Sequence, residues 1–219
     1  MMVVLSIIIV ITSIALFGQS NFNRSVLLTD TTYTVALSLR EMQSLGLSSR
    51  KFSTVQNAGY GGYFSATNRD SYVLFADTYK PAGTPLSNCL VGAANTPEQK
   101  PGDCFYNFGN ANPALNDGIV QTYTFTRGFI VRQFCGYEGA LRRCSPLPGG
   151  TPGAGELSEI NISFLRSSTE AAISGKRDGG VSVVLTSAEI YIQSADGLGT
   201  RGICVSRIGQ ISVAAGTCP

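Results

Sequence analysis

Six cysteines carry the most specific chemistry in this sequence. None lies in a C-x-x-C pair and the chain has no histidine, so the spacings of 15, 9 and 14 residues within successive pairs differ from those of zinc sites. We therefore expect disulfides in an oxidising compartment; the alternative is six buried free thiols in a reducing one. The intervening Pro, Gly and Asn residues favour the local pairings Cys89 with Cys104, Cys135 with Cys144, and Cys204 with Cys218.

Other chemistry-bearing residues give little support for catalysis. Without histidine, Ser–His, Cys–His and zincin chemistry are excluded. We assign no catalytic, cofactor-binding or metal-ligating residue and expect no enzyme and no cofactor. The basic pairs Arg142-Arg143 and Lys176-Arg177 are isolated and lack flanking aromatic residues, and the net charge is only +2. This argues against nucleic acid as a partner.

Two weaker motifs leave alternatives open. A G-x-G-x-x-G match spans Gly197–Gly202 but precedes the strand-like Ile203–Arg207 instead of a helix, so a turn is favoured over a phosphate site. An oxygen-rich loop could gather around calcium, but it lacks the EF-hand spacing, and a turn-forming loop is favoured. Its residues are Asp103, Asn107, Asn110, Asn112, Asn116 and Asp117.

The elements that carry these residues begin with an apolar N-terminus. The first 23 residues are uncharged and 1–17 are almost entirely hydrocarbon, enough to cross much of a bilayer. We expect a helix over 1–46, about 70 Å long, with a single transmembrane segment that ends between residues 17 and 23. The residues expected to be embedded are Val3, Val4, Leu5, Ile7, Ile8, Ile9, Val10, Ile11, Ile14, Leu16 and Phe17.

The second half of this helix is amphipathic. Semi-apolar residues recur at steps of three and four, which indicates one face that packs on a sheet. They are Leu28, Thr32, Val35, Leu39, Met42 and Leu45. The alternatives are a free-standing stalk or a short coiled coil, although the heptad repeat is not sustained.

Residues 47–219 have the pattern of one β-rich head. Alternating apolar and polar residues predict nine short strands: 60–66, 72–76, 119–126, 129–134, 159–165, 181–185, 189–193, 202–207 and 210–214. Long loops near 81–113 and 135–155 each hold one expected disulfide. A helix followed by antiparallel strands predicts an α+β fold, with the long helix packed on an antiparallel sheet.

The N-terminus also raises the question of export. A secretory signal peptide would have a basic start and small residues at a cleavage site, and both are missing. For an ordinary anchor, the first basic residue, Arg24, lies on the exported side, against the positive-inside rule. We therefore expect a short, positively charged leader upstream of Met1.

Several segments resemble one protein family. Met2–Val10 resembles the segment that follows the leader junction of type IV pilins and pseudopilins. Thr34–Gly46, Ser71–Asp77, Ile160–Phe164 and Arg201–Val213 resemble the H-type minor pseudopilins of type II secretion and the FimT-like minor pilins. The resemblance implies a pilin-like fold and N-terminal methylation after leader cleavage, but the family's cleavage glycine, methylated residue and early glutamate have no counterpart here.

The resemblance implies a minor pseudopilin or minor pilin. Such a subunit is stored in the cytoplasmic membrane with its head in the periplasm or outside the cell. It is then extracted into a helical filament that serves protein secretion. Its partners would be other pilin or pseudopilin subunits, the assembly platform of the cytoplasmic membrane, and the bilayer. The alternative is a single-pass anchored binding or adhesion module that does not polymerise.

Overall fold

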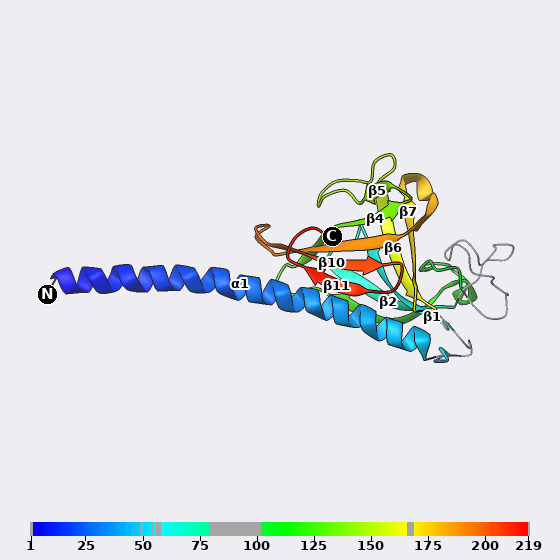
Figure 1. Cartoon of the computed structure of the whole chain (residues 1–219), viewed down its shortest axis with the longest axis horizontal. Helices are drawn as coiled ribbons and strands as arrows, with labels where there is room; N and C mark the ends of the chain where they lie inside the picture. The colour runs from blue at the N-terminus through cyan, green and yellow to red at the C-terminus, as the bar shows by residue number, and fades with distance from the viewer. Residues whose placement is uncertain are drawn as a thin grey trace.

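The computed structural model of the protein describes residues 2–48, 50–53, 55, 58–78, 102–165 and 169–218. Helix α1 (Met2–Leu47) has 46 residues, runs along one side of a β-rich head and continues well beyond it (Figure 1). Within α1 the side chains of residues 2, 11 and 14–22 lie outside the description. Among the residues that the structure describes, no helix is both long enough and apolar enough to cross a membrane.

Eleven described strands form two antiparallel sheets. The six-stranded sheet has the order β3-β2-β1-β6-β7-β8, and the five-stranded sheet has the order β11-β10-β9-β4-β5. The first comprises β1 (Gly59–Ser65), β2 (Ser71–Asp77), β3 (Gly118–Thr124), β6 (Leu157–Phe164), β7 (Ala171–Arg177) and β8 (Ser182–Leu185). The second comprises β4 (Ile130–Glu138), β5 (Leu141–Cys144), β9 (Ser187–Gln193), β10 (Thr200–Ser206) and β11 (Ile211–Ala214). Two 3₁₀ turns, η2 (Pro113–Leu115) and η3 (Asp178–Gly180), complete the described elements.

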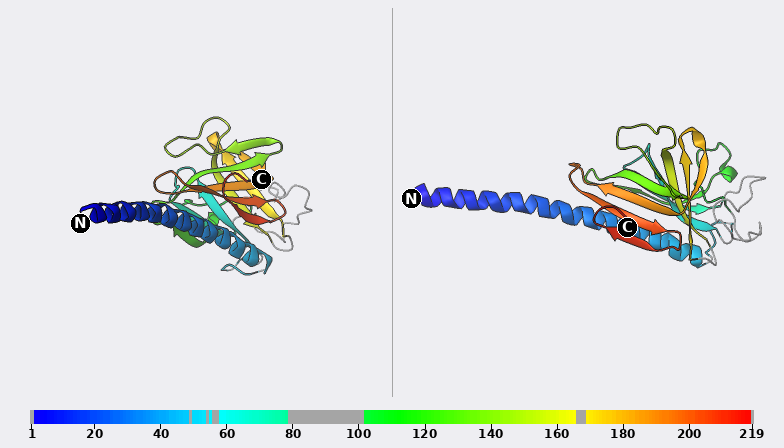
Figure 2. Two further views of the ribbon diagram at one scale, coloured as in Figure 1. Left: turned by 60° about the vertical axis from the view of Figure 1, so that its left-hand side comes forward. Right: turned by 45° about the horizontal axis from the view of Figure 1, so that its top comes forward.

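The expected fold class is therefore wrong. We predicted a pilin-like α+β arrangement with the helix on one antiparallel sheet, whereas the strands divide between two sheets (Figure 2). Helix α1 contacts β1 and β6 of one sheet and β9, β10 and β11 of the other. The alternation of side chains shows that a segment is a half-buried strand, but its partners are set by distant residues. The pattern could not say how many sheets there are.

One core joins the helix to both sheets. Leu39 and Met42 of α1 are fully buried in the same cluster as Ile162 of β6 and Ile203 of β10. The close approach of the helix depends on Gly62 in β1, because a Cβ atom there would lie 2.7 Å from Leu39 Cδ2. The amphipathic half of α1 is thus a central part of the head.

The outer face of the six-stranded sheet is also covered. Residues 102–117 lie over it, so that Tyr106 packs against Tyr63 of β1 and Phe75 of β2. Coverage on both faces explains why β1 and β6 have long runs of consecutive buried residues instead of alternation.

The prediction of a long loop near 135–155 is wrong in part. Strand β4 continues to Glu138 and pairs with β5 in a hairpin, where Cys135 lies directly opposite its disulfide partner Cys144. Strands β5 and β7 were not predicted. Edge strand β5, Leu-Arg-Arg-Cys, is largely exposed, and β7 begins with small residues, so neither has the apolar alternation that identifies a strand.

A second pair of cysteines has the expected local bond. Cys204 of β10 is bonded to Cys218, and Cys104 is disulfide-bonded. Its expected partner, Cys89, lies outside the described residues, as does most of the loop expected at 81–113.

Two leucines of α1 test whether the head depends on the buried face of the helix. Leu39 is fully buried, whereas Leu37 is 58% exposed two residues earlier. We expect Leu39→Ala to lower the free energy of unfolding by about 2–5 kcal/mol, because it leaves a cavity between helix and sheet. Leu37→Ala should change it by no more than about 0.5 kcal/mol. Chemical denaturation with the disulfides intact measures both, and equal losses would contradict the shared core.

Candidate functional site

The half of α1 that projects beyond the head, residues 2–23, carries a run of exposed apolar side chains, and we call it the projecting half. Seven of the eleven side chains predicted to be embedded are described, and each is 53–71% exposed. They are Val3, Val4, Leu5, Ile7, Ile8, Ile9 and Val10. The side chains of the other four, Ile11, Ile14, Leu16 and Phe17, lie outside the description. An exposed apolar surface of this kind marks an interaction site.

Three described hydroxyl groups in this half of the helix form hydrogen bonds within the helix. Ser6 donates to the carbonyl oxygen of Val3 at 2.9 Å, and Ser13 donates to that of Ile9 at 2.7 Å. Thr12 likewise donates to the carbonyl of Ile8. These three hydroxyl groups therefore need no water as a hydrogen-bond acceptor, and apolar groups can surround the helix around them.

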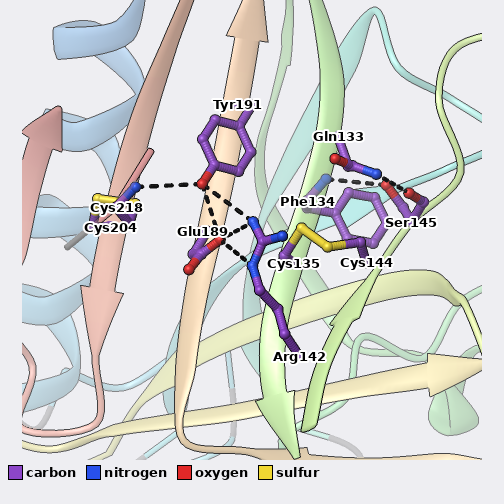
Figure 3. A network of polar contacts seen from close by, with 10 residues as sticks. All are labelled: Gln133, Phe134, Cys135, Arg142, Cys144, Ser145, Glu189, Tyr191, Cys204 and Cys218. Atoms are coloured by element: carbon purple, nitrogen blue, oxygen red, sulfur yellow. Dashed lines mark hydrogen bonds and ion pairs between the residues drawn. A yellow bond between two sulfur atoms is a disulfide. The ribbon is translucent and has the colours of Figure 1, made fainter. Parts of the chain in front are cut away.

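A polar network lies on the outer face of the five-stranded sheet (Figure 3). The buried Glu189 of β9 accepts hydrogen bonds from Arg142 Nη2 at 2.5 Å and Nε at 3.1 Å, and from the Tyr191 hydroxyl at 2.9 Å. The Tyr191 oxygen in turn accepts from the amide of Cys218 at 3.4 Å. The hydrogen bond to Glu189 raises the pKa of Arg142, and burial raises that of Tyr191.

Strand register places this network between two disulfides. Glu189 lies opposite Cys204 on one neighbouring strand and Cys135 on the other. The Cys204–Cys218 disulfide brings the C-terminal segment over the sheet, and the Cys135–Cys144 disulfide closes the hairpin that carries Arg142. The ion pair and the two covalent links therefore hold β5, β9 and the C-terminal segment together.

A cleft of about 330 Å³ opens beside this network. Strand β4 has a bulge at Arg132. The Arg132 side chain reaches β10, where Arg132 Nη1 donates to the Thr200 hydroxyl at 3.2 Å. Together with Arg142 and Gln133, it gives the cleft several hydrogen-bond donors around the Tyr191 ring. Arginine and a tyrosine of raised pKa keep their protons near neutral pH, so this arrangement suits binding more than proton transfer.

The oxygen-rich loop considered for calcium forms hydrogen bonds within itself. Asp117 accepts from the amides of Thr78 and Asn107, and Asn107 Nδ2 donates to Asp103. Asn110 and Asn116 bond to each other. Within the described ranges, no group of three or more His, Cys, Asp or Glu is placed to hold a metal ion. The hydrogen bonds within the loop are those expected of the turn-forming interpretation.

Asp77 lies under this loop and is fully buried. Its carboxylate accepts hydrogen bonds from the amides of Asp103 at 3.1 Å and Cys104 at 2.6 Å. Burial, followed by the nearby carboxylates of Asp117 and Asp103, raises the pKa of Asp77 well above its usual range, although the two amides oppose this. Asp77 thus anchors the loop at an electrostatic cost.

The glycine motif forms the expected turn. Residues 194–199 connect β9 to β10, Gly197 has a φ of 75°, and its amide donates to the carbonyl of Ser194 at 2.9 Å. Because a strand follows it, no helix N-terminus is available for a phosphate.

The sequence interpretation missed the pairing of Arg142 with Glu189. One signal was present, since Glu189 interrupts an apolar strand, Ala-Glu-Ile-Tyr-Ile, and a buried carboxylate needs a partner.

Comparisons of the chain with protein-family models, curated proteins and solved structures find no match.

The raised pKa of Asp77 predicts how stability depends on pH. Above about pH 4 the unfolded chain loses this proton while the folded protein keeps it, so the free energy of unfolding falls as pH rises toward the pKa of the folded state. Asp77→Asn removes this titration and should flatten that part of the profile. Denaturant titrations between pH 4 and pH 8 measure the slope, and identical slopes in both proteins would contradict this assignment.

The burial of Glu189 in its ion pair with Arg142 predicts a difference in stability between two glutamate variants. Glu189→Gln leaves Arg142 without its charged partner and should lower the free energy of unfolding by about 1–3 kcal/mol. Glu138→Gln is the matched control, because Glu138 pairs with Arg143 but its side chain is 34% exposed. It should cost at most about 1 kcal/mol. Thermal or chemical unfolding compares the two variants, and the same loss in both would show that the burial of Glu189 does not matter.

Proposed function

We propose that this chain is a structural subunit of a helical filament. It would act as minor pseudopilins and minor pilins do in type II secretion or type IV pili. The observation that most directly supports this proposal is the row of seven exposed apolar side chains from Val3 to Val10. This row lies at the end of a helix whose other half is buried in the head. The proposal concerns this helix and does not depend on a pilin-like head.

Two environments can cover this row in succession. Lipid would surround it while the subunit is stored in the cytoplasmic membrane, and equivalent segments of neighbouring subunits would surround it in the filament. The uncharged first 23 residues and the internally bonded hydroxyls of Ser6 and Ser13 suit both environments. Partner proteins of the membrane assembly platform would supply the energy for extraction.

The disulfides support the proposed location of the head. Cys135–Cys144 and Cys204–Cys218 form and persist in oxidising compartments, as expected for a head in the periplasm or outside the cell. No nucleic acid or cofactor enters this proposal.

The cleft beside Arg132 and Arg142 favours a second candidate function. A membrane-anchored module that binds a ligand there, without polymerising, would also use a rigid, disulfide-linked surface. Cross-linking between helices of neighbouring copies discriminates the two, because only the filament brings those helices together.

A charge in the projecting half tests the filament proposal. Ile9 is 55% exposed, and Ile9→Asp would place a carboxylate in the apolar environment at a cost of about 2.5–3.5 kcal/mol at the bilayer centre. We expect the variant to leave the membrane fraction and to be absent from isolated filaments, with the head still folded. Ile9→Leu is the control and should behave as the wild type.

The proposal fails if Ile9→Asp fractionates with membranes and assembles normally. Far-UV circular dichroism and intact disulfides check that the head of each variant is folded.

A further inference from the structure

The helix leaves the head beside the loop between β9 and β10. Arg24 of α1 forms an ion pair with Asp196 of this loop. The Ser194 hydroxyl and the Leu198 amide donate to the same carboxylate at 2.6 and 3.1 Å. These contacts, led by that of Ser194, hold the pKa of Asp196 below its usual range, so it stays ionised and keeps the loop attached to the helix.

Two further arginines lie around this point. One cleft of about 250 Å³ is lined by Arg24, Leu198 and Arg201, and a second of about 330 Å³ is lined by Arg24, Arg127 and Asp196. We call Arg24, Arg127, Leu198 and Arg201 the exit surface. Asp196 lines the second of these clefts, and it is paired with Arg24.

The exit surface therefore has an excess of positive charge. Neither Arg127 nor Arg201 forms an ion pair with a described residue. Leu198, at the tip of the loop, is 82% exposed and is the most exposed large apolar residue that the structure describes. An exposed leucine among unpaired arginines suits the boundary between lipid headgroups and hydrocarbon, where apolar and cationic side chains both find partners.

We propose that the exit surface binds the phosphate groups of anionic phospholipids at the surface of the bilayer. This inference rests on the proposed function, because the projecting half of α1 must be inserted first. Residues 2–23 of a helix span about 33 Å, close to the roughly 30 Å of the hydrocarbon. Arg24 then lies at the level of the headgroups, and Arg127 and Arg201, which share its clefts, lie beside it.

The consequence is that the stored subunit rests with its head on the membrane. Each arginine near an anionic surface strengthens the contact about fivefold, and salt weakens it. Subunits would therefore be held in one orientation before assembly, with the five-stranded sheet turned in a defined direction.

A single fluorescent reporter tests this contact. The chain has no tryptophan, so Leu198→Trp introduces one into the full-length protein inserted in vesicles of phosphatidylcholine, with or without phosphatidylglycerol. With phosphatidylglycerol present we expect blue-shifted emission and quenching by lipids that carry a nitroxide on the headgroup. Adding Arg127→Gln and Arg201→Gln should reduce the docked fraction about fivefold for each arginine removed.

The matched control places the reporter at the other end of β10. Ile208 is 69% exposed and precedes Gly209, whose carbonyl oxygen accepts from Gln43. Gln43 lies 19 residues, about 28 Å, along the helix from Arg24. Ile208→Trp should therefore emit as in water in both kinds of vesicle.

The outcomes separate this inference from the function on which it rests. If the full chain does not float with either kind of vesicle, membrane insertion fails and the inference fails with it. If the chain floats but Leu198→Trp emits alike in both kinds of vesicle, or like Ile208→Trp, membrane insertion stands and lipid binding by the exit surface is overturned.

Discussion

The burial of one face of α1 against both sheets is the constraint on which the rest of the structure depends. Leu28, Val35, Leu39 and Met42 of the helix are buried in the same cluster as residues of both sheets. Polar groups on this face are also satisfied, since the Ser38 hydroxyl lies 3.0 Å from that of Tyr72. Removing the helix would open the core of both sheets at once, so the head and the second half of α1 form one structural unit.

This arrangement sets the direction in which the projecting half leaves the head. Helix α1 runs without a break from Met2 to Leu47, so the projecting half continues the axis of the residues buried against the head. An apolar segment on such a helix has a defined direction relative to the head. Both the proposed packing in a filament and the proposed contact of the exit surface with lipid require the helix to leave the head in a fixed direction. A flexible linker between helix and head would not provide one.

The sequence predicted local features better than long-range ones. The helix boundary, the apolar face of its second half and nine strands depend on periodicity within a few residues, and each has a counterpart in the structure. The pairings Cys135–Cys144 and Cys204–Cys218 are local too. The division into two sheets was not predictable in this way, because β4 follows β3 in the chain yet belongs to the other sheet. Strand β5, short and exposed, had no pattern to find.

The candidate surfaces also differ in whether their residues are close together or far apart in the chain. The apolar row from Val3 to Val10 is visible in the sequence because its members are neighbours in the chain. The exit surface combines residues near positions 24, 127 and 200, which only the folded head brings together. Among the described side chains, Arg24 forms the first ion pair between helix and head, and the core contacts begin with Leu27 and Leu28. The apolar row thus lies before the first described contacts between α1 and the head, and none of those contacts involves it.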